Sequence, residues 1–156
     1  SPFTGLAEVA FGPCLPVEPG PPPVGYSICP GGQATFAAEV VGSGPFTYRW
    51  RKDSVELDPQ ANPTATSATL VVSNIGPADA GAYDCVVTGP CGSTTTGAAI
   101  LSICPADMNC DGTADFNDYL EFLNLYNAND PRVDFNADGA VDFNDYLEFL
   151  NLYNAC

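Results

Sequence analysis

The feature that most constrains this chain is an acidic twelve-residue segment that occurs twice. The first copy, residues 107–118, reads DMNCDGTADFND, and the second copy, residues 134–145, reads DFNADGAVDFND. Asp or Asn occupies positions 1, 3, 5, 9 and 12 of both copies, and glycine occupies position 6. Because so many carboxylates within one short loop repel one another, each segment needs a cation to fold compactly.

The spacing of these residues is that of a calcium loop. Ca²⁺ takes about six to eight oxygen ligands, and such a loop supplies them from positions 1, 3, 5, 9 and 12, from the backbone carbonyl of position 7, and around a glycine turn at position 6. We therefore predict two bound Ca²⁺ ions. The predicted ligands are Asp107, Asn109, Asp111, Thr113, Asp115, Asp118, Asp134, Asn136, Asp138, Ala140, Asp142 and Asp145.

An identical stretch begins inside each copy and covers residues 115–128 and 142–155. Its apolar residues recur at helical spacing, so each stretch predicts one helix with an apolar stripe. In the first helix the stripe comprises Phe116, Tyr119, Leu120, Leu123 and Tyr126, widened by Phe122 and Leu125. A two-helix core is small, so we expect four of the apolar residues to remain exposed. These are Phe122, Leu125, Phe149 and Leu152.

No amphipathic segment precedes the first loop, so the order is loop–helix twice. Residues 104–156 therefore resemble the dockerin domain, especially the dockerins at the C-termini of secreted planctomycete proteins, which often end in cysteine. The resemblance implies two units packed antiparallel and a cohesin-type partner gripped by loop positions 10 and 11. The docking residues predicted on this basis are Phe116, Asn117, Phe143 and Asn144. Phe122 and Phe149 are further predicted docking residues, because we expect them to be exposed. The small hydroxyl pair common in cellulosomal dockerins is absent, so a standard cellulosomal partner is not expected.

Length and charge bound the remaining functions. The 156 residues suffice for two small domains, and the net charge is −15. Residues 105–156 hold eleven acidic residues against Arg132 alone, and residues 1–104 hold eight against three basic ones. Nucleic-acid binding needs basic side chains that displace counterions from phosphates, so we predict no nucleic-acid partner.

The chain has the composition of a secreted protein. No apolar run reaches the roughly 18 residues that span a bilayer, so we predict no membrane span. The start at Ser1 lacks a basic region followed by an apolar core, as expected of a mature or trimmed terminus. Seven cysteines and two calcium loops favour an oxidising, calcium-rich extracellular location.

Residues 1–25 contain seven prolines, which exclude a continuous helix and favour an extended N-terminal arm. Residues 3–11 lack proline and carry apolar side chains. Two interpretations remain open for them: a flexible leader, or a strand that adds to a sheet edge of its own or of a neighbouring copy.

Residues 26–103 predict a β-sandwich, with strand-like segments separated by turn residues. The expected strands are 33–41, 46–52, 67–73, 81–88 and 93–102. Trp50 and the segment DAGAYDC at 79–85 resemble the core tryptophan and tyrosine corner of an intermediate-type immunoglobulin-like domain. The predicted fold class is thus an all-β immunoglobulin-like sandwich followed by a small all-α dockerin-like domain of paired calcium loop–helix units.

Seven cysteines leave several pairings open. In an immunoglobulin-like domain the usual partner of Cys85 stands where this chain has Ala38. Either Cys29 reaches Cys85, or Cys85 is a buried free thiol and Cys29 pairs elsewhere, for instance with Cys104. Further candidate pairs are Cys14 with Cys91 and, by the dockerin resemblance, Cys104 with Cys156. Cys110 is the expected odd thiol.

The chain contains no histidine, so histidine-based nucleophiles and zinc sites are excluded, and we predict neither an enzyme nor a small-molecule site. Two functions agree with these features. In the first, which an arm suited to strand addition favours, the chain is a calcium-stabilised extracellular structural protein that self-associates into a filament or surface assembly through its arm, immunoglobulin-like and dockerin-like surfaces. In the second, it is a dockerin-type tail that anchors a larger secreted protein to a cohesin-bearing scaffold.

Overall fold

The computed structural model describes residues 12–156, which divide into two compact units. Within the described chain, unit 1 contains residues 12–25, 35–71 and 81–100, and unit 2 contains residues 26–34, 72–80 and 101–156. The predicted leader or strand at residues 3–11 lies outside the described residues. The domain boundaries expected from the sequence, after residues 25 and 103, stay predictions.

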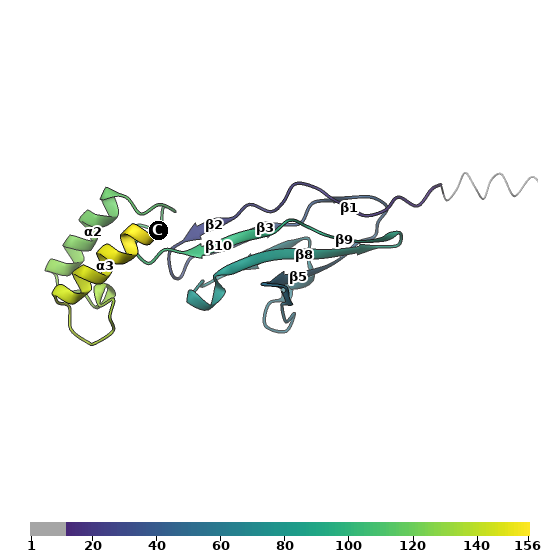
Figure 1. The fold of residues 1–156 in the computed structure, drawn as a ribbon. Coiled ribbons are helices and arrows are strands. Elements are labelled where there is room, and N and C mark those ends of the chain that lie inside the picture. The colour runs from purple at the N-terminus through teal and green to yellow at the C-terminus, as the bar shows by residue number, and fades with distance from the viewer. Residues whose placement is uncertain (1–11) are drawn as a thin grey trace, which may run out of the picture. The chain divides into compact units, whose positions relative to one another are not determined.

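Unit 1 consists mainly of antiparallel strands (Figure 1). They are β1 (Glu18–Pro19), β3 (Ala34–Ala37), β4 (Val40–Val41), β5 (Thr47–Lys52), β6 (Val55–Glu56), β7 (Thr69–Val72), β8 (Gly81–Gly89), β9 (Gly92–Thr95) and the start of β10 (Ala99–Ile103), with the 3₁₀ helix η1 (Pro63–Thr66). The largest sheet runs β10–β8–β5–β6 with β9 also on β8, while β3 pairs with β7 and β1 with β4. The predicted β-sandwich is confirmed.

The core of unit 1 is built around Trp50, which lies opposite Cys85 in the β5–β8 register. The indole Nε1 of Trp50 donates a hydrogen bond of 2.8 Å to the carbonyl of Ser67. Phe36 stacks on Tyr83 with ring centroids 4.9 Å apart, and all three aromatic side chains are buried. Trp50 therefore has the core role predicted for it.

Residues 12–25, the described part of the predicted arm, are extended but fastened to unit 1. Strand β1 pairs with β4, Val17 is buried, and a disulfide joins Cys14 to Cys91. The described part of the expected arm is therefore extended, as predicted, and the expected pairing of Cys14 with Cys91 is confirmed. Proline-rich chain is already extended, and an edge position tolerates its missing backbone donors.

Unit 2 combines a parallel strand pair with two helices. Strand β2 (Tyr26–Ile28) runs parallel to the end of β10, with Ile28 opposite Ile103. The unit also holds the 3₁₀ helices η2 (Pro77–Asp79) and η3 (Pro131–Val133). Helices α2 (Phe116–Asn127) and α3 (Phe143–Ala155) lie side by side (Figure 1) and match the predicted bounds to within one residue. Among the described residues, neither helix has the length and apolarity to cross a membrane.

The two helices pack through the same face of each copy. Phe122 and Phe149 stack at a centroid distance of 4.1 Å, and both are fully buried. The expectation that these two residues and Leu125 exceed the core is wrong, because the core is not made by the helices alone. Cys104, Ala106 and Val133, from the segments that lead into the loops, close over the phenylalanines. Leu152 is partly buried.

Three disulfides are present in the described chain, and two of them lie in unit 2. Cys104 bonds to Cys156, the pairing expected from the sequence. Cys29 bonds to Cys110, so the prediction that Cys110 is the odd thiol is wrong. Parallel pairing places the end of β2 beside the end of β10, and this brings Cys29 close to the chain that enters the first loop. Cys85 is the free cysteine, and it is buried.

Candidate metal centre

The first acidic loop, residues 107–118, brings three of its predicted ligands together. Carboxylate oxygens of Asp107, Asp111 and Asp118, at loop positions 1, 5 and 12, lie within 4.8 Å of one another. Asp107 and Asp118 are buried, whereas Asp111 is exposed. Two buried carboxylates beside a third make a concentration of negative charge that is costly unless a cation lies among them.

Backbone amides give the loop its shape. Asp107 accepts hydrogen bonds from the amide of Asp111 at 3.1 Å and from the amide of Gly112 at 2.9 Å. The Asp111 amide also lies 3.0 Å from Oδ1 of Asn109. Gly112 has a φ of +93°, a conformation that side chains disfavour, which explains glycine at position 6. The loop therefore wraps around its own carboxylates.

The last loop residue is tied to the start of helix α2. Asp118 accepts hydrogen bonds from the amides of Asn109 at 3.0 Å and Asp115 at 2.8 Å. Asp115 in turn caps the helix by accepting from the amide of Asn117 at 2.9 Å. This reciprocal capping satisfies amides that would otherwise lack partners at the helix start. Loop geometry and helix formation are thus coupled.

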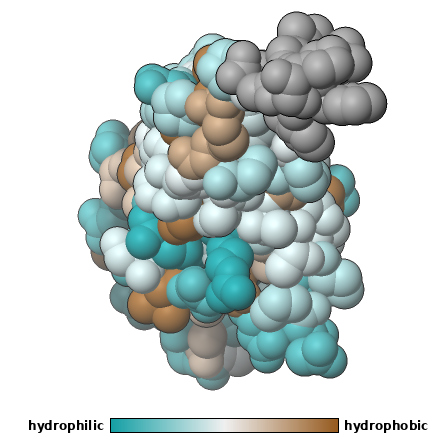
Figure 2. Space-filling model, turned by 90° about the vertical axis from the view of Figure 1, so that its right-hand side faces the viewer, coloured by the Kyte–Doolittle hydropathy of each residue, from teal (hydrophilic) through white to brown (hydrophobic). Residues whose placement is uncertain are grey.

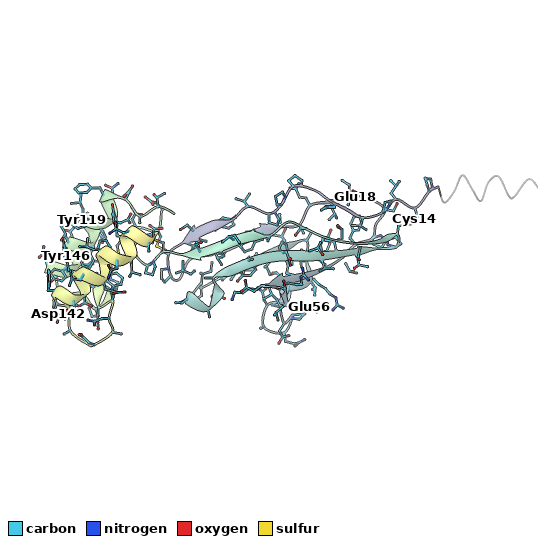
Figure 3. All side chains as sticks on the ribbon, in the orientation of Figure 1. Cys14, Glu18, Glu56, Tyr119, Asp142 and Tyr146 are labelled. Carbon is cyan, nitrogen blue, oxygen red and sulfur yellow. A yellow bond between two sulfur atoms is a disulfide. The ribbon has the colours of Figure 1, made fainter. Side chains whose placement is uncertain are left out.

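The second loop, residues 134–145, repeats these hydrogen bonds. Asp134 accepts from the amides of Asp138 at 3.2 Å and Gly139 at 2.9 Å. Asp145 accepts from Asn136 at 3.2 Å and from Asp142 at 2.8 Å. The hydrogen bond from the Asp142 amide, with others from the backbone, lowers the pKa of the buried Asp145 carboxyl, so that it stays ionised. Asp142 lies at the start of α3 (Figure 3) and caps it as Asp115 caps α2.

The remaining predicted ligands lie on the same loops. Thr113 donates its hydroxyl and its amide to Asp111, at 2.9 and 3.0 Å, and the amide of Ala140 donates to Asp138 at 2.9 Å. These bonds fix the turn after position 5 and do not use the carbonyls of positions 7, which are the predicted ligand atoms. The calcium ligand set stays a prediction, and the geometry fits it.

Basic side chains do not neutralise the loops. All four lie in the described chain, and each forms its ion pair elsewhere: Arg49 with Glu56, Arg51 with Asp84, Lys52 with Asp53 and Arg132 with Asp130. The Arg132 guanidinium lowers the pKa of Asp130 to about 2. The loop carboxylates therefore have backbone amides as partners and no protein cation among the described residues.

The predicted docking residues divide into two groups. Phe116, Asn117, Phe143 and Asn144, at loop positions 10 and 11, are exposed. Phe122 and Phe149 are buried against each other, so their prediction as docking residues is wrong. The sequence alone does not separate the groups, because all four phenylalanines belong to one helical apolar pattern.

Two further exposed residues, which were not among the predicted docking residues, complete a surface with the exposed phenylalanines. Leu120 and Leu147 follow the exposed phenylalanines by one helical turn, and that spacing of four was the available signal. We call these four residues, in two repeat-related pairs, the apolar docking surface. Their exposed fractions are 65% for Phe116, 44% for Leu120, 63% for Phe143 and 45% for Leu147.

A row of aromatic rings connects the two halves of this surface. Phe116 stacks on Tyr119, and Phe143 stacks on Tyr146, with centroids 6.1 and 5.8 Å apart. Tyr119 and Tyr146 extend from the two helices toward each other (Figure 3). By contrast, among the described residues on the face drawn in Figure 2, hydrophobic patches are small and separated by hydrophilic residues.

A protein-family model, the immunoglobulin I-set domain, matches residues 21–101. This match covers more than half of the chain. The chain belongs to the immunoglobulin I-set family. The I-set match contains Trp50 and Cys85 and ends before the acidic loops, so the loops lie outside the part of the chain that defines the family.

Relatives and solved structures agree with the I-set assignment. The chain is 35% identical over 81 residues to the advanced glycosylation end product-specific receptor of Mus musculus, covering 47% of this chain and 19% of the receptor. It is 38% identical over 66 residues to the Homo sapiens receptor, covering 42% of this chain and 15% of the receptor. The chain thus spans less than a fifth of the length of these curated relatives.

Two solved structures share the immunoglobulin-like fold. The I-band fragment I67-I69 from titin has a TM-score of 0.50 and 28% identity, covering 59% of this chain and 33% of that one. The N-terminal Ig1-2 module of the Drosophila receptor protein tyrosine phosphatase DLAR has a TM-score of 0.52 and 21% identity, covering 60% of this chain and 48% of that one. An I-set domain accompanied by three disulfides is typical of extracellular proteins that bind other proteins.

Proposed function

We propose that this chain is a non-enzymatic, secreted docking protein in which two Ca²⁺ ions hold the helical pair in shape for binding a protein partner. The observation that carries the proposal is the convergence of Asp107, Asp111 and Asp118 within 4.8 Å, two of them buried. The four basic side chains, all in the described chain, form their ion pairs with other carboxylates. Oxygen-only ligands, flexible side chains and high negative charge favour Ca²⁺ over other biological cations.

Calcium would supply both charge neutralisation and folding energy. Unit 2 has a small helical core, and a structural ion that binds only the folded loop stabilises it by its full binding energy. Asp118 and Asp145 accept hydrogen bonds from backbone amides at the starts of α2 and α3. An ion bound to either carboxylate therefore also stabilises the helix that begins there. The predicted result is a module whose helices depend on calcium.

The docking part of the proposal is supported by the apolar docking surface. Its two phenylalanines and two leucines are exposed to water in a unit rich in acidic residues. Exposed apolar residues within a polar surround are typical of protein-interaction sites. A fitting partner therefore presents apolar side chains at its centre and basic side chains at its rim, as a cohesin-like domain of a scaffold would.

Self-association into a filament is the second candidate. It would use strand addition by the N-terminal arm. Residues 12–25 already pair within unit 1, so any exchanged strand would have to come from residues 3–11, which lie outside the described chain. Strand addition by residues 3–11 therefore stays a prediction, and the docking proposal rests on the described residues.

Calorimetric titration of the full chain with Ca²⁺, together with circular dichroism in chelator, tests the calcium part. We expect two ions per chain and a loss of helical signal at 222 nm in EDTA, reversed by added Ca²⁺. The Asp118→Asn and Asp145→Asn variants should each lose one ion. Unchanged helicity and no heat of binding up to millimolar Ca²⁺ would refute it.

Light scattering after size-exclusion chromatography separates docking from self-association. Docking predicts a monomer in Ca²⁺ that binds an isolated cohesin-like domain, and Phe116→Ser combined with Phe143→Ser should abolish that binding. Val55 is an exposed apolar residue of unit 1 and serves as the matched control, so Val55→Ser should leave binding unchanged. Growth of the wild-type chain into large assemblies would favour the filament instead.

A further inference from the structure

The two acidic loops carry the same ligand side chains in different surroundings. Positions 1, 3, 5, 9 and 12 are Asp, Asn, Asp, Asp and Asp in both. Calcium affinity of such loops is set by the charge of the ligands and by the rigidity of the site. Because the charge is equal here, any difference in affinity between the loops must come from rigidity and environment.

A disulfide restrains only the first loop. Cys110 stands at position 4, between the predicted ligands Asn109 and Asp111, and bonds to Cys29, which directly follows β2. Position 4 of the second loop is Ala137, which is exposed and forms no covalent link. Both residues adopt the left-handed conformation, with φ of 61° for Cys110 and 57° for Ala137. This conformation is unfavourable for a non-glycine residue, so it needs support from its surroundings.

The aspartates of the first loop are also more buried than their counterparts in the second loop. Asp107 is buried, whereas its counterpart Asp134 is partly exposed, and Asp115 is partly buried, whereas Asp142 is exposed. Within the described chain, one group of three acidic side chains converges within 4.8 Å, and it belongs to the first loop.

The β2 segment accounts for this difference. A Cβ atom built on Gly112 would lie 3.6 Å from the carbonyl of Ser27, whereas one on Gly139 would meet nothing within 4 Å. Ser27, Gln33, Asp107 and Asp111 also line one hollow of about 280 Å³ inside unit 2. The first loop therefore has a protein wall beside it, and the second loop faces solvent.

We infer that the two loops form unequal calcium sites: the first binds Ca²⁺ more tightly and releases it more slowly, and the Cys29–Cys110 disulfide is the cause. The inference rests on the calcium binding proposed above. A loop that is already held in its binding conformation loses less conformational entropy when the ion arrives, and this raises affinity. The second loop has no such link and must order position 4 at the moment of binding.

The two loops can be followed separately through the amides of Gly112 and Gly139. We would titrate Ca²⁺ into the ¹⁵N-labelled full chain, prepared free of calcium, and record both amide signals. In the oxidised wild type, the Gly112 signal should saturate at a calcium concentration at least about tenfold below that of Gly139. Chelator-induced calcium release should show a slow and a fast phase.

The decisive variant combines Cys29→Ser with Cys110→Ala, which gives the first loop the residue that the second loop carries naturally. The two glycine signals should then saturate within about threefold of each other, and the slow release phase should disappear. The matched control is Cys14→Ala with Cys91→Ala, which removes the disulfide of unit 1 and should leave the difference between the loops unchanged.

Each outcome separates this inference from the proposed function. Equal saturation of the two glycines in the wild type, or a difference that survives the Cys29→Ser/Cys110→Ala change, overturns the inference while leaving calcium binding intact. No shift of either glycine up to millimolar Ca²⁺ overturns the calcium proposal itself. If the double variant fails to fold, the wild-type titration and its release phases still decide whether the sites are unequal.

Discussion

The hydroxyl oxygen of Tyr119 lies 3.0 Å from that of Tyr146, its counterpart 27 residues later. The rings of Phe122 and Phe149, which are also counterparts, stack 4.1 Å apart. When equivalent residues of two repeats contact each other, the contact lies on a local twofold axis that relates the repeats. The duplicated stretch therefore supplies both sides of one interface, and a change in it acts on the same contact from either copy.

The Phe122→Ala change should destabilise the helical pair by about 3–5 kcal/mol, because it opens a cavity in a fully buried core. The Phe116→Ala change, in the same helix but exposed, should alter stability by less than about 0.5 kcal/mol. Chemical denaturation in calcium, followed at 222 nm, measures both. Equal effects of the two changes would contradict the assignment of core and surface.

Removing either tyrosine hydroxyl should cost about 1 kcal/mol through loss of the shared hydrogen bond. Because Tyr119→Phe and Tyr146→Phe remove the same bond, the double variant should lose no more than either single one. Thermal unfolding of the four proteins forms a double-mutant cycle. Additive losses would show that the two hydroxyls do not bond to each other in solution.

The thiol of Cys85 should be inert in the folded protein. Burial raises the pKa of this thiol from 9.0 to about 11, so it stays protonated at neutral pH. A thiol reagent at pH 8 should label no cysteine until the chain unfolds, and then one per chain, since the other six form disulfides.

The same raised pKa predicts a loss of stability in alkali. The protonated thiol favours the folded state fully below pH 9, and this contribution is lost as the pH rises toward 11, since the unfolded thiol ionises first. The Cys85→Ala variant should show a smaller fall in melting temperature over that pH range than the wild type. Identical dependence of melting temperature on pH in the two proteins would contradict the raised pKa of Cys85.

Two cross-strand ion pairs of unit 1 should differ in strength. Arg51 binds Asp84 through two hydrogen bonds of 2.8 and 2.7 Å in a partly buried setting, whereas Arg49 makes one exposed contact with Glu56. Arg51→Lys should therefore cost about 1 kcal/mol, since lysine does not reproduce the paired geometry. Arg49→Lys is the matched control and should be nearly neutral. Urea denaturation followed by Trp50 fluorescence compares them.

Local patterns allowed much of this structure to be predicted. Helical spacing placed α2 and α3, turn residues separated the main strands of the sandwich, and Trp50 marked its core. The acidic loops were visible because calcium ligands follow a fixed spacing, which the hydrogen bonds of Asp107 and Asp134 reproduce. Such features depend on residues that are near one another in the sequence.

The errors concern contacts between distant residues. Pairing of Cys29 with Cys110 depends on the parallel register of β2 and β10, and β2 is only three residues long, too short to give a periodic signal. Burial of Phe122 depends on Ala106 and Val133, which lie outside α2 and α3. The exposed Phe116 and the buried Phe122 carry the same side chain, so composition could not distinguish them.

The Cys104–Cys156 disulfide also determines how the chain transmits mechanical force. Cys104 directly follows β10, so tension applied at Cys156 passes through the sulfur bridge to the end of that strand. Residues 111–155 lie outside this path, because the Cys29–Cys110 and Cys104–Cys156 bridges attach the chain on either side of them. Pulling on the chain would therefore leave the second acidic loop relaxed, and its retention of an ion would be insensitive to stretching until the Cys104–Cys156 disulfide is reduced.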